Sequence, residues 1–128
     1  MNRVVIGVGS NIEPQKHIAA ARERIARDHR LLAESRFVET RPIGGPAQPN
    51  FSNGALLIET TMSREALKIW LETVEADLGR VRGANRYDPR TIDLDIVVWN
   101  GEIVDPDVYE RRFLREAVLE VWPDPAIE

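Results

Sequence analysis

The sequence predicts a single α+β domain, a ferredoxin-like β-α-β-β-α-β sandwich with an antiparallel sheet, completed by a C-terminal hairpin strand and helix. Apolar runs of strand length alternate with segments of helical periodicity, and two strand-like runs follow each other in the middle. The length of 128 residues suits one hydrophobic core, so residues 1–128 are expected to form one domain. We expect helices to cover the sheet mainly on one face. Because this fold serves enzymes, RNA binders and regulatory modules, it does not identify a function.

The first half of the chain contains three predicted strands and one predicted helix. Residues 4–9 are a short apolar run that ends in glycine, and residues 15–28 carry apolar side chains on one helical face. Further strands are predicted over 31–40 and 51–60. The segment 40–50 between them is rich in proline and glycine and forms a long loop, of a length that is often functional in small domains.

The second half begins with a helix that has clear start and stop signals. Ser63 has the side chain of an N-cap, an apolar stripe of helical spacing follows it, and Gly79 stands where a C-terminal glycine belongs. A strand over 92–99 then leads through the hairpin dipeptide Asn100-Gly101 into a short strand. A last helix is predicted over 107–121.

Composition excludes several classes of protein and site. The chain has no cysteine and only two histidines, which excludes disulfides, thiolate zinc sites and histidine-rich metal sites. Its net charge of −4 gives no overall basic surface for nucleic acid. No apolar run approaches the length that crosses a membrane, and the N-terminus lacks a signal-peptide core. We expect a cytoplasmic monomer that binds neither nucleic acid nor membrane.

The most informative stretch, residues 80–99, places four arginines before two aspartates. Asp93 and Asp95 are two residues apart on a predicted strand, so they project from the same face with Cα atoms roughly 6–7 Å apart. Two such carboxylates can hold hard cations, and guanidinium groups suit phosphate oxygens. The stretch therefore suggests a magnesium–polyphosphate site, although two aspartates on the solvent face of a strand beside a solvated basic loop remain an equal alternative at this point.

Two other readings are weaker. The segment 7–12 resembles a dinucleotide-binding fingerprint, but Ile12 occupies the place of the third glycine and the chain lacks repeated parallel units. An RNA-binding module of the same fold would need an aromatic pair on its strands for base stacking, and the strands lack it.

The stretch resembles the signature of the 6-hydroxymethyl-7,8-dihydropterin pyrophosphokinase family of the folate pathway. The resemblance covers nearly the whole chain in the right order. It rests on Gly9-Ser10-Asn11, Thr40-x-Pro42-x-Gly44, Gln48-Pro49-x-Phe51-x-Asn53, Glu75-x-x-Leu78-Gly79-Arg80, Arg80-Val81-Arg82, Arg86 and the run from Pro89 to Ile96.

The resemblance implies an enzyme that transfers pyrophosphate from ATP to the hydroxymethyl oxygen of a reduced pterin and releases AMP. It implies that Asp93 and Asp95 hold two magnesium ions and that Asp95 also helps to take the hydroxyl proton. It assigns catalytic roles to Arg80, Arg82, Arg90 and Asp95, and ATP contacts to Glu75, Arg80, Arg82, Arg86, Arg90 and Arg111. It places Thr40, Pro42, Ile43, Phe51, Asn53 and Phe113 at the pterin, with the two phenylalanines stacking on its ring.

The sequence departs from the family pattern at a position that matters for ATP. Asp105 stands where the family has a histidine that reaches the ATP phosphates, and a carboxylate there would repel them. Smaller departures fall at Gly83, at Tyr87-Asp88 and at Ala117. The alternative to an active enzyme is therefore a non-catalytic or diverged paralogue that binds a pterin or a nucleotide.

Overall fold

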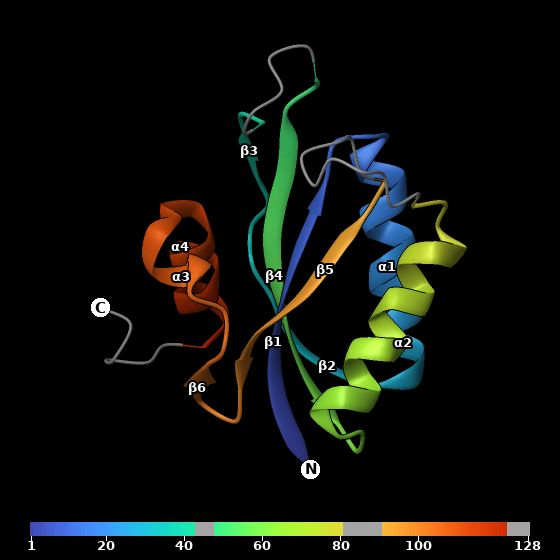
Figure 1. Cartoon of the computed structure of the whole chain (residues 1–128), viewed down its shortest axis with the longest axis vertical. Helices are drawn as coiled ribbons and strands as arrows, with labels where there is room; N and C mark the ends of the chain where they lie inside the picture. The colour runs from blue at the N-terminus through green and yellow to red at the C-terminus, as the bar shows by residue number, and fades with distance from the viewer. Residues whose placement is uncertain (43–47, 81–90, 123–128) are drawn as a thin grey trace.

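The computed structural model describes residues 1–42, 48–80 and 91–122. Within these ranges it contains six strands and four helices (Figure 1). Their bounds are β1 (Asn2–Ser10), α1 (Pro14–Asp28), β2 (Arg30–Glu34), β3 (Val38–Thr40), β4 (Phe51–Thr60), α2 (Arg64–Asp77), β5 (Asp93–Trp99), β6 (Glu102–Ile103), α3 (Asp107–Glu110) and α4 (Arg112–Val121).

The sheet is antiparallel, with β1 at its centre. The strand order is β2-β4-β1-β5-β6, and β3 pairs with β4 beyond the end of β2. β1 and β4 pair along their whole length, from Asn2 opposite Thr60 to Ser10 opposite Ser52. The order of the four longer strands confirms the ferredoxin-like α+β class that the sequence predicts.

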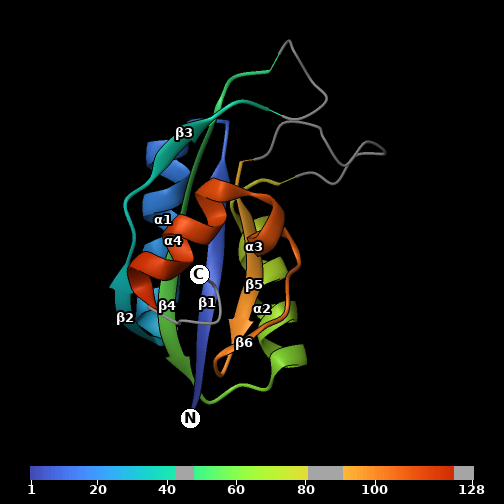
Figure 2. The same ribbon diagram turned by 90° about the vertical axis from the view of Figure 1, so that its left-hand side faces the viewer.

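Helices lie on both faces of the sheet, which corrects the expectation of cover mainly on one face. α1 and α2 cover one face, and α3 and α4 lie on the other (Figures 1 and 2). Two hydrophobic clusters result. The larger includes Ile6, Ile25, Ile58, Leu71 and Ile92, and the smaller includes Val5, Val97, Val98, Leu114 and Val118.

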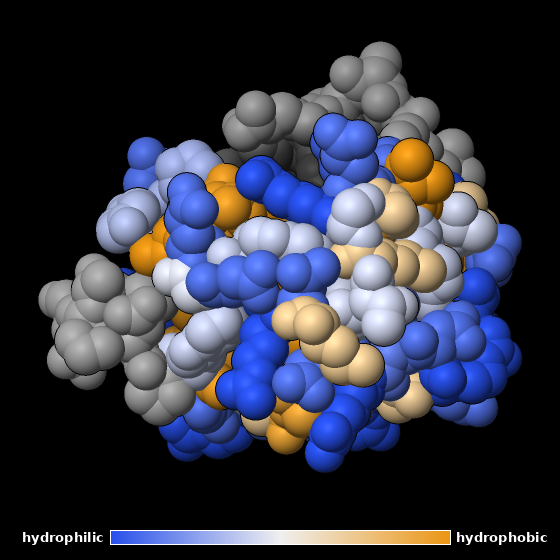
Figure 3. Space-filling model, turned by 90° about the horizontal axis from the view of Figure 1, so that it is seen from below, coloured by the Kyte–Doolittle hydropathy of each residue, from blue (hydrophilic) through white to orange (hydrophobic). Residues whose placement is uncertain are grey.

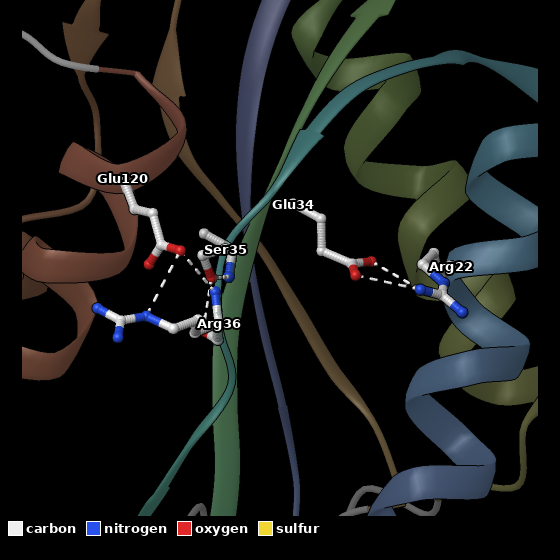
Figure 4. A network of polar contacts seen from close by, with 6 residues as sticks. Arg22, Glu34, Ser35, Arg36 and Glu120 are labelled. Atoms are coloured by element: carbon white, nitrogen blue, oxygen red, sulfur yellow. Dashed lines mark hydrogen bonds and ion pairs between the residues drawn. The ribbon is translucent and has the colours of Figure 1, made fainter.

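The segment 31–40, expected as one strand, forms two. The chain leaves the sheet after Ser35, whose backbone and hydroxyl both bond to Ala55. The next amide, that of Arg36, donates to Glu120 on α4 instead of to a strand, while Glu34 pairs with Arg22 on α1 (Figure 4). Side chains from helices on both faces thus hold this crossing point, which local sequence pattern does not reveal.

β5 departs from the alternation expected over 92–99. The pairing of β1 with β5 shifts register between Val5 and Ile6, a β-bulge. As a result Val97 and Val98 both belong to the smaller core, while Trp99 packs against the larger one. The alternation is right from Ile92 to Ile96 and wrong at Val98 and Trp99.

The helix predicted over 107–121 is two helices. Arg111, at φ −112° and ψ 108°, is extended and separates α3 from α4. Its carbonyl accepts hydrogen bonds from Leu114 and Arg115 and so begins α4. The break lets α4 turn across the sheet.

The predicted start and stop signals of α2 are confirmed, because Ser63 caps its first turn and Gly79 has a φ of 89°.

The described surface carries few large apolar side chains. No helix among the described residues is long and apolar enough to cross a bilayer. Figure 3, the view from below, shows hydrophilic surface with apolar residues in small separate areas. The exposed large apolar side chains of the described ranges are Met1, Ile12, Val38, Ile69 and Tyr109.

Candidate active site

A cavity of about 380 Å³ lies where β1, β4 and β5 face the corner between α3 and α4. It joins segments that are far apart in the sequence. Its polar lining comprises Thr40, Arg41, Asn53, Asp93, Asp95, Asp105, Asp107 and Arg111, and its other lining residues are Gly7, Val8, Gly9, Phe51, Gly54, Val97, Phe113 and Leu114.

The predicted acidic pair lies on the cavity wall, side by side on β5. Asp93 and Asp95 are opposite Gly9 and Gly7 of β1. Because these glycines have no side chain, they leave space in the cavity above β1. A Cβ on Gly7 would lie 3.1 Å from a methyl of Val97, and one on Gly9 would lie 2.8 Å from the side-chain oxygen of Asn53. Both aspartates therefore line a concave surface, with Asp95 exposed in it.

The electrostatics of the site disfavour ionisation of Asp95. Desolvation by the surrounding protein, followed by the charges of Asp93, Glu75 and Asp105, raises the pKa of Asp95 to about 7, and Arg80 opposes this shift. The side chain nevertheless keeps contact with solvent. Negative charge therefore accumulates where a cation or a proton would relieve it.

Arg80 stands behind the pair and outside the cavity lining. Its Nη1 lies 2.6 Å from Glu75 and 3.0 Å from Asp93, and its side chain is 11% exposed. Glu75 is buried at 2% exposure and also accepts a hydrogen bond from the backbone of Leu94. The predicted ATP contacts Arg80 and Glu75 thus engage each other in this structure.

The expected pterin residues gather at the other end of the cavity. Asn53 donates from its amide nitrogen to the hydroxyl of Thr40 over 2.5 Å. This contact spans the β3–β4 pair, where Val38 is opposite Asn53. Phe51 and Phe113 both line the cavity, from β4 and from the first turn of α4. Pro42 is described but does not line the cavity.

Asp105 faces the cavity from the segment before α3. One of its oxygens accepts a hydrogen bond from the backbone of Asp107 at 3.0 Å, which fixes the carboxylate at the start of the helix. Its charge reaches Asp95. Arg111 also lines the cavity and is paired with Asp107 at 3.6 Å. Asp105, at which the sequence departs from the family pattern, therefore lines the same cavity as the acidic pair.

Some predicted residues lie outside the described ranges. They are Ile43 of the pterin set and Arg82, Arg86 and Arg90 of the arginine series, and their roles stay predictions. In the described part of the chain, no group of three or more acidic or histidine side chains is arranged to hold a metal ion.

The predicted set of site residues omits several that line the cavity, among them Arg41, Gly54, Asp107 and Leu114. Asp107 could have been found from its spacing to Arg111, since residues four apart on a helix meet. Gly54 could not have been found, because the need for glycine there comes from close packing against the ring of Phe37. A Cβ on Gly54 would be 2.8 Å from atoms of that ring.

Comparison with known proteins points to one family. The family described as 7,8-dihydro-6-hydroxymethylpterin-pyrophosphokinase (HPPK) matches residues 5–123. The chain is 36% identical over 108 residues to a 2-amino-4-hydroxy-6-hydroxymethyldihydropteridine pyrophosphokinase of Pseudomonas aeruginosa, which covers 82% of this chain but only 66% of that relative. It is 35% identical over 128 residues to the protein of the same name from Methylorubrum extorquens, covering 96% of this chain and 80% of the relative.

A third similarity is to part of a larger protein. The folic acid synthesis protein fol1 of Pneumocystis carinii is 32% identical over 131 residues, which cover 94% of this chain and 18% of that protein.

Proposed function

The chain belongs to the 7,8-dihydro-6-hydroxymethylpterin-pyrophosphokinase family, and we propose that it transfers pyrophosphate from ATP to 6-hydroxymethyl-7,8-dihydropterin in the cavity beside β5. The products are AMP and the pterin pyrophosphate, an intermediate of folate biosynthesis. The observation that carries this proposal is the placement of Asp93 and Asp95 on one wall of a cavity that also holds two phenylalanines and an amide. A flat heterocycle and a polyphosphate thus have separate ends to occupy.

The pterin would lie between Phe51 and Phe113. One ring comes from β4 and the other from α4, and a flat ring between them would gain stacking as well as burial. The amide nitrogen of Asn53 is engaged by Thr40, which leaves the side-chain oxygen to accept from the pterin. Pro42 and Ile43 would contribute from the loop that follows Thr40.

The donor set of the acidic pair fits magnesium. Mg²⁺ is held by one or two carboxylates together with water and phosphate oxygens, so Asp93 and Asp95 need no third protein ligand. When bound with ATP, two such ions would neutralise phosphate charge and polarise the phosphorus under attack. Asp95, whose pKa is raised to about 7, would accept the proton of the hydroxymethyl group.

Arginines would hold the phosphates. Arg111 lines the cavity, and it would exchange its pairing with Asp107 for a phosphate oxygen. Arg80, behind Asp93, would act from the far side of the acidic pair. Arg82, Arg86 and Arg90 follow it in the sequence and would complete the phosphate contacts when substrates are bound.

A diverged paralogue that binds a pterin without transfer is the second candidate, and one observation favours it. Asp105 adds a carboxylate to the cavity where ATP would bring more negative charge. Losing one donor in a charge-stabilising role costs on the order of 3 kcal/mol, and reversing its sign should cost more.

An assay of AMP release separates the two candidates. The protein is incubated with ATP, magnesium and 6-hydroxymethyl-7,8-dihydropterin, and AMP is measured against reactions that lack the pterin. Pterin-dependent AMP supports the enzyme. Background AMP with retained pterin binding, measured by calorimetry, refutes it and favours the paralogue.

We further propose that the chain acts as a monomer in the cytoplasm, where ATP is available.

A further inference from the structure

Glu75 is a carboxylate buried inside the molecule, in the last turns of α2. Its side chain is 3% exposed, and it does not line the cavity. Its neighbours Leu71 and Val74 on the same helix belong to the larger hydrophobic core. A buried carboxylate is costly unless charged and hydrogen-bonding partners compensate it. The partners of Glu75 therefore indicate what the residue is for.

One oxygen of Glu75, Oε2, serves two partners on the described part of the chain. It accepts a hydrogen bond from the backbone N–H of Leu94 at 2.8 Å and one from Nη1 of Arg80 at 2.6 Å. The same Nη1 of Arg80 lies 3.0 Å from Oδ1 of Asp93. The three side chains form one chain of contacts that runs from α2 to the start of β5.

The backbone contact falls between the two aspartates of the cavity. Leu94 separates Asp93 from Asp95, and its own side chain points into the larger core. β6 pairs only with Val98 and Trp99, so it does not reach this end of β5. Glu75 supplies the acceptor that a neighbouring strand would otherwise provide, and it does so with a group held rigidly by the core.

We propose that Glu75 is a positioning residue, which fixes the spacing of Asp93 and Asp95 through Leu94 and through Arg80, and does not contact the nucleotide. This inference rests on the proposed function for the role of the two aspartates. It replaces the expectation that Glu75 is an ATP contact. Groups that orient metal-binding carboxylates in this way alter metal affinity or activity by about 10- to 100-fold when they are changed.

The test compares Glu75→Gln with Glu65→Gln, the same chemical change at an exposed position of the same helix. Binding of Mn²⁺ alone to the substrate-free protein is followed by electron paramagnetic resonance, and steady-state kinetics give kcat and the KM for ATP. We expect Glu75→Gln to weaken Mn²⁺ binding about tenfold and to lower kcat, with a KM for ATP within about twofold of the wild type. Glu65→Gln should match the wild type.

The opposite pattern overturns the inference. If Glu75→Gln binds Mn²⁺ as the wild type does and raises the KM for ATP, then Glu75 contacts the nucleotide. A wild-type protein that releases no AMP would refute the proposed function, yet the Mn²⁺ titration would still show whether Glu75 controls the acidic pair. The two failures are thus distinguishable.

A measurement on the unmodified protein keeps the inference testable if Glu75→Gln does not fold. Nuclear magnetic resonance can detect the coupling across the hydrogen bond from the Leu94 amide to the Glu75 carboxylate carbon. We expect this coupling both in the free protein and with magnesium and a non-hydrolysable ATP analogue bound. Its disappearance on nucleotide binding would mean that Glu75 is released to the ligand and would overturn the positioning role.

Discussion

Asp95 lies among like charges, and this has a cost in stability. Its carboxylate is surrounded by the charges of Asp93, Glu75 and Asp105, and Arg80 only partly offsets them. Such a concentration of like charge is typical of sites that bind a ligand of opposite charge. It also means that the metal-free protein carries repulsion that a substitution can remove.

We predict that Asp95→Asn stabilises the metal-free protein while it lowers transfer at least about a hundredfold. The pKa of Asp95 is raised from 3.8 to about 7 in the folded protein. Stability linked to its protonated form is thus present below pH 3.8 and is lost as the pH rises through 7. Asn keeps the neutral state, so the melting temperature in a metal chelator should rise by roughly 5 °C at pH 8, with a gain that shrinks toward pH 4. An equal melting temperature at pH 8 would show that the repulsion is relieved in another way.

Asp105 adds a negative charge to the cavity in which we propose that ATP binds. We predict that Asp105→His lowers the KM for ATP by about tenfold, since it replaces repulsion of the phosphates by a donor, a gain of about 1.4 kcal/mol. Asp105→Asn is the matched control, because it removes the charge and retains an oxygen for the Asp107 amide. Steady-state kinetics at saturating pterin provide the measurement. If neither variant changes the KM, Asp105 does not face the triphosphate.

His29, which follows α1, contacts residues of β4 and α2. Its Nδ1 lies 3.0 Å from the hydroxyl of Thr60 on β4, and its ring packs edge-on against Trp70 of α2 with centroids 4.4 Å apart. The Thr60 hydroxyl also accepts from the amide of Met62, so its own proton is free to go to a neutral Nδ1. The Nε2 atom is buried without a hydrogen-bond partner in the described part of the chain.

This arrangement predicts acid sensitivity. Burial lowers the pKa of His29 below 6.5, although Asp28 opposes the shift. The unfolded chain therefore binds a proton more readily, and stability is lost as the pH falls below about 6.5. Thermal unfolding at pH 7.5 and 5.5 should show a larger loss for the wild type than for His29→Gln. His17→Gln, at the other histidine, serves as the control and should retain the wild-type difference. An undiminished loss in His29→Gln would assign the sensitivity to another group.

The boundaries of some helices and strands can be predicted from local sequence pattern, and those of others cannot. α2 begins and ends where its cap and glycine predict, because both signals act within one turn of the helix. The break at Arg111 and the split of residues 31–40 depend on contacts with distant segments, such as Arg36 with Glu120. Period and composition carry no information about those contacts.

The two hydrophobic cores share one sheet, and this should make unfolding cooperative. β1 contributes Val4, Ile6 and Val8 to one face and Val5 to the other, so neither core can open without disturbing the central strand. We predict a single transition in urea, with coincident midpoints for circular dichroism and tryptophan fluorescence. Trp70 and Trp99 report on the larger core and Trp122 on the smaller. Separate midpoints would mean that α4 detaches first.

The sequence determined the fold class, the order of the elements, and the pairing of Asp93 with Asp95 on one strand face, since each follows from local periodicity and chain order. Only the tertiary structure decided what faces that pair. The bulge in β5, the burial of Glu75 behind Leu94 and the approach of Asp105 depend on register and packing between segments far apart in the chain. Such contacts are fixed by how whole elements fit together, which no short stretch of sequence encodes.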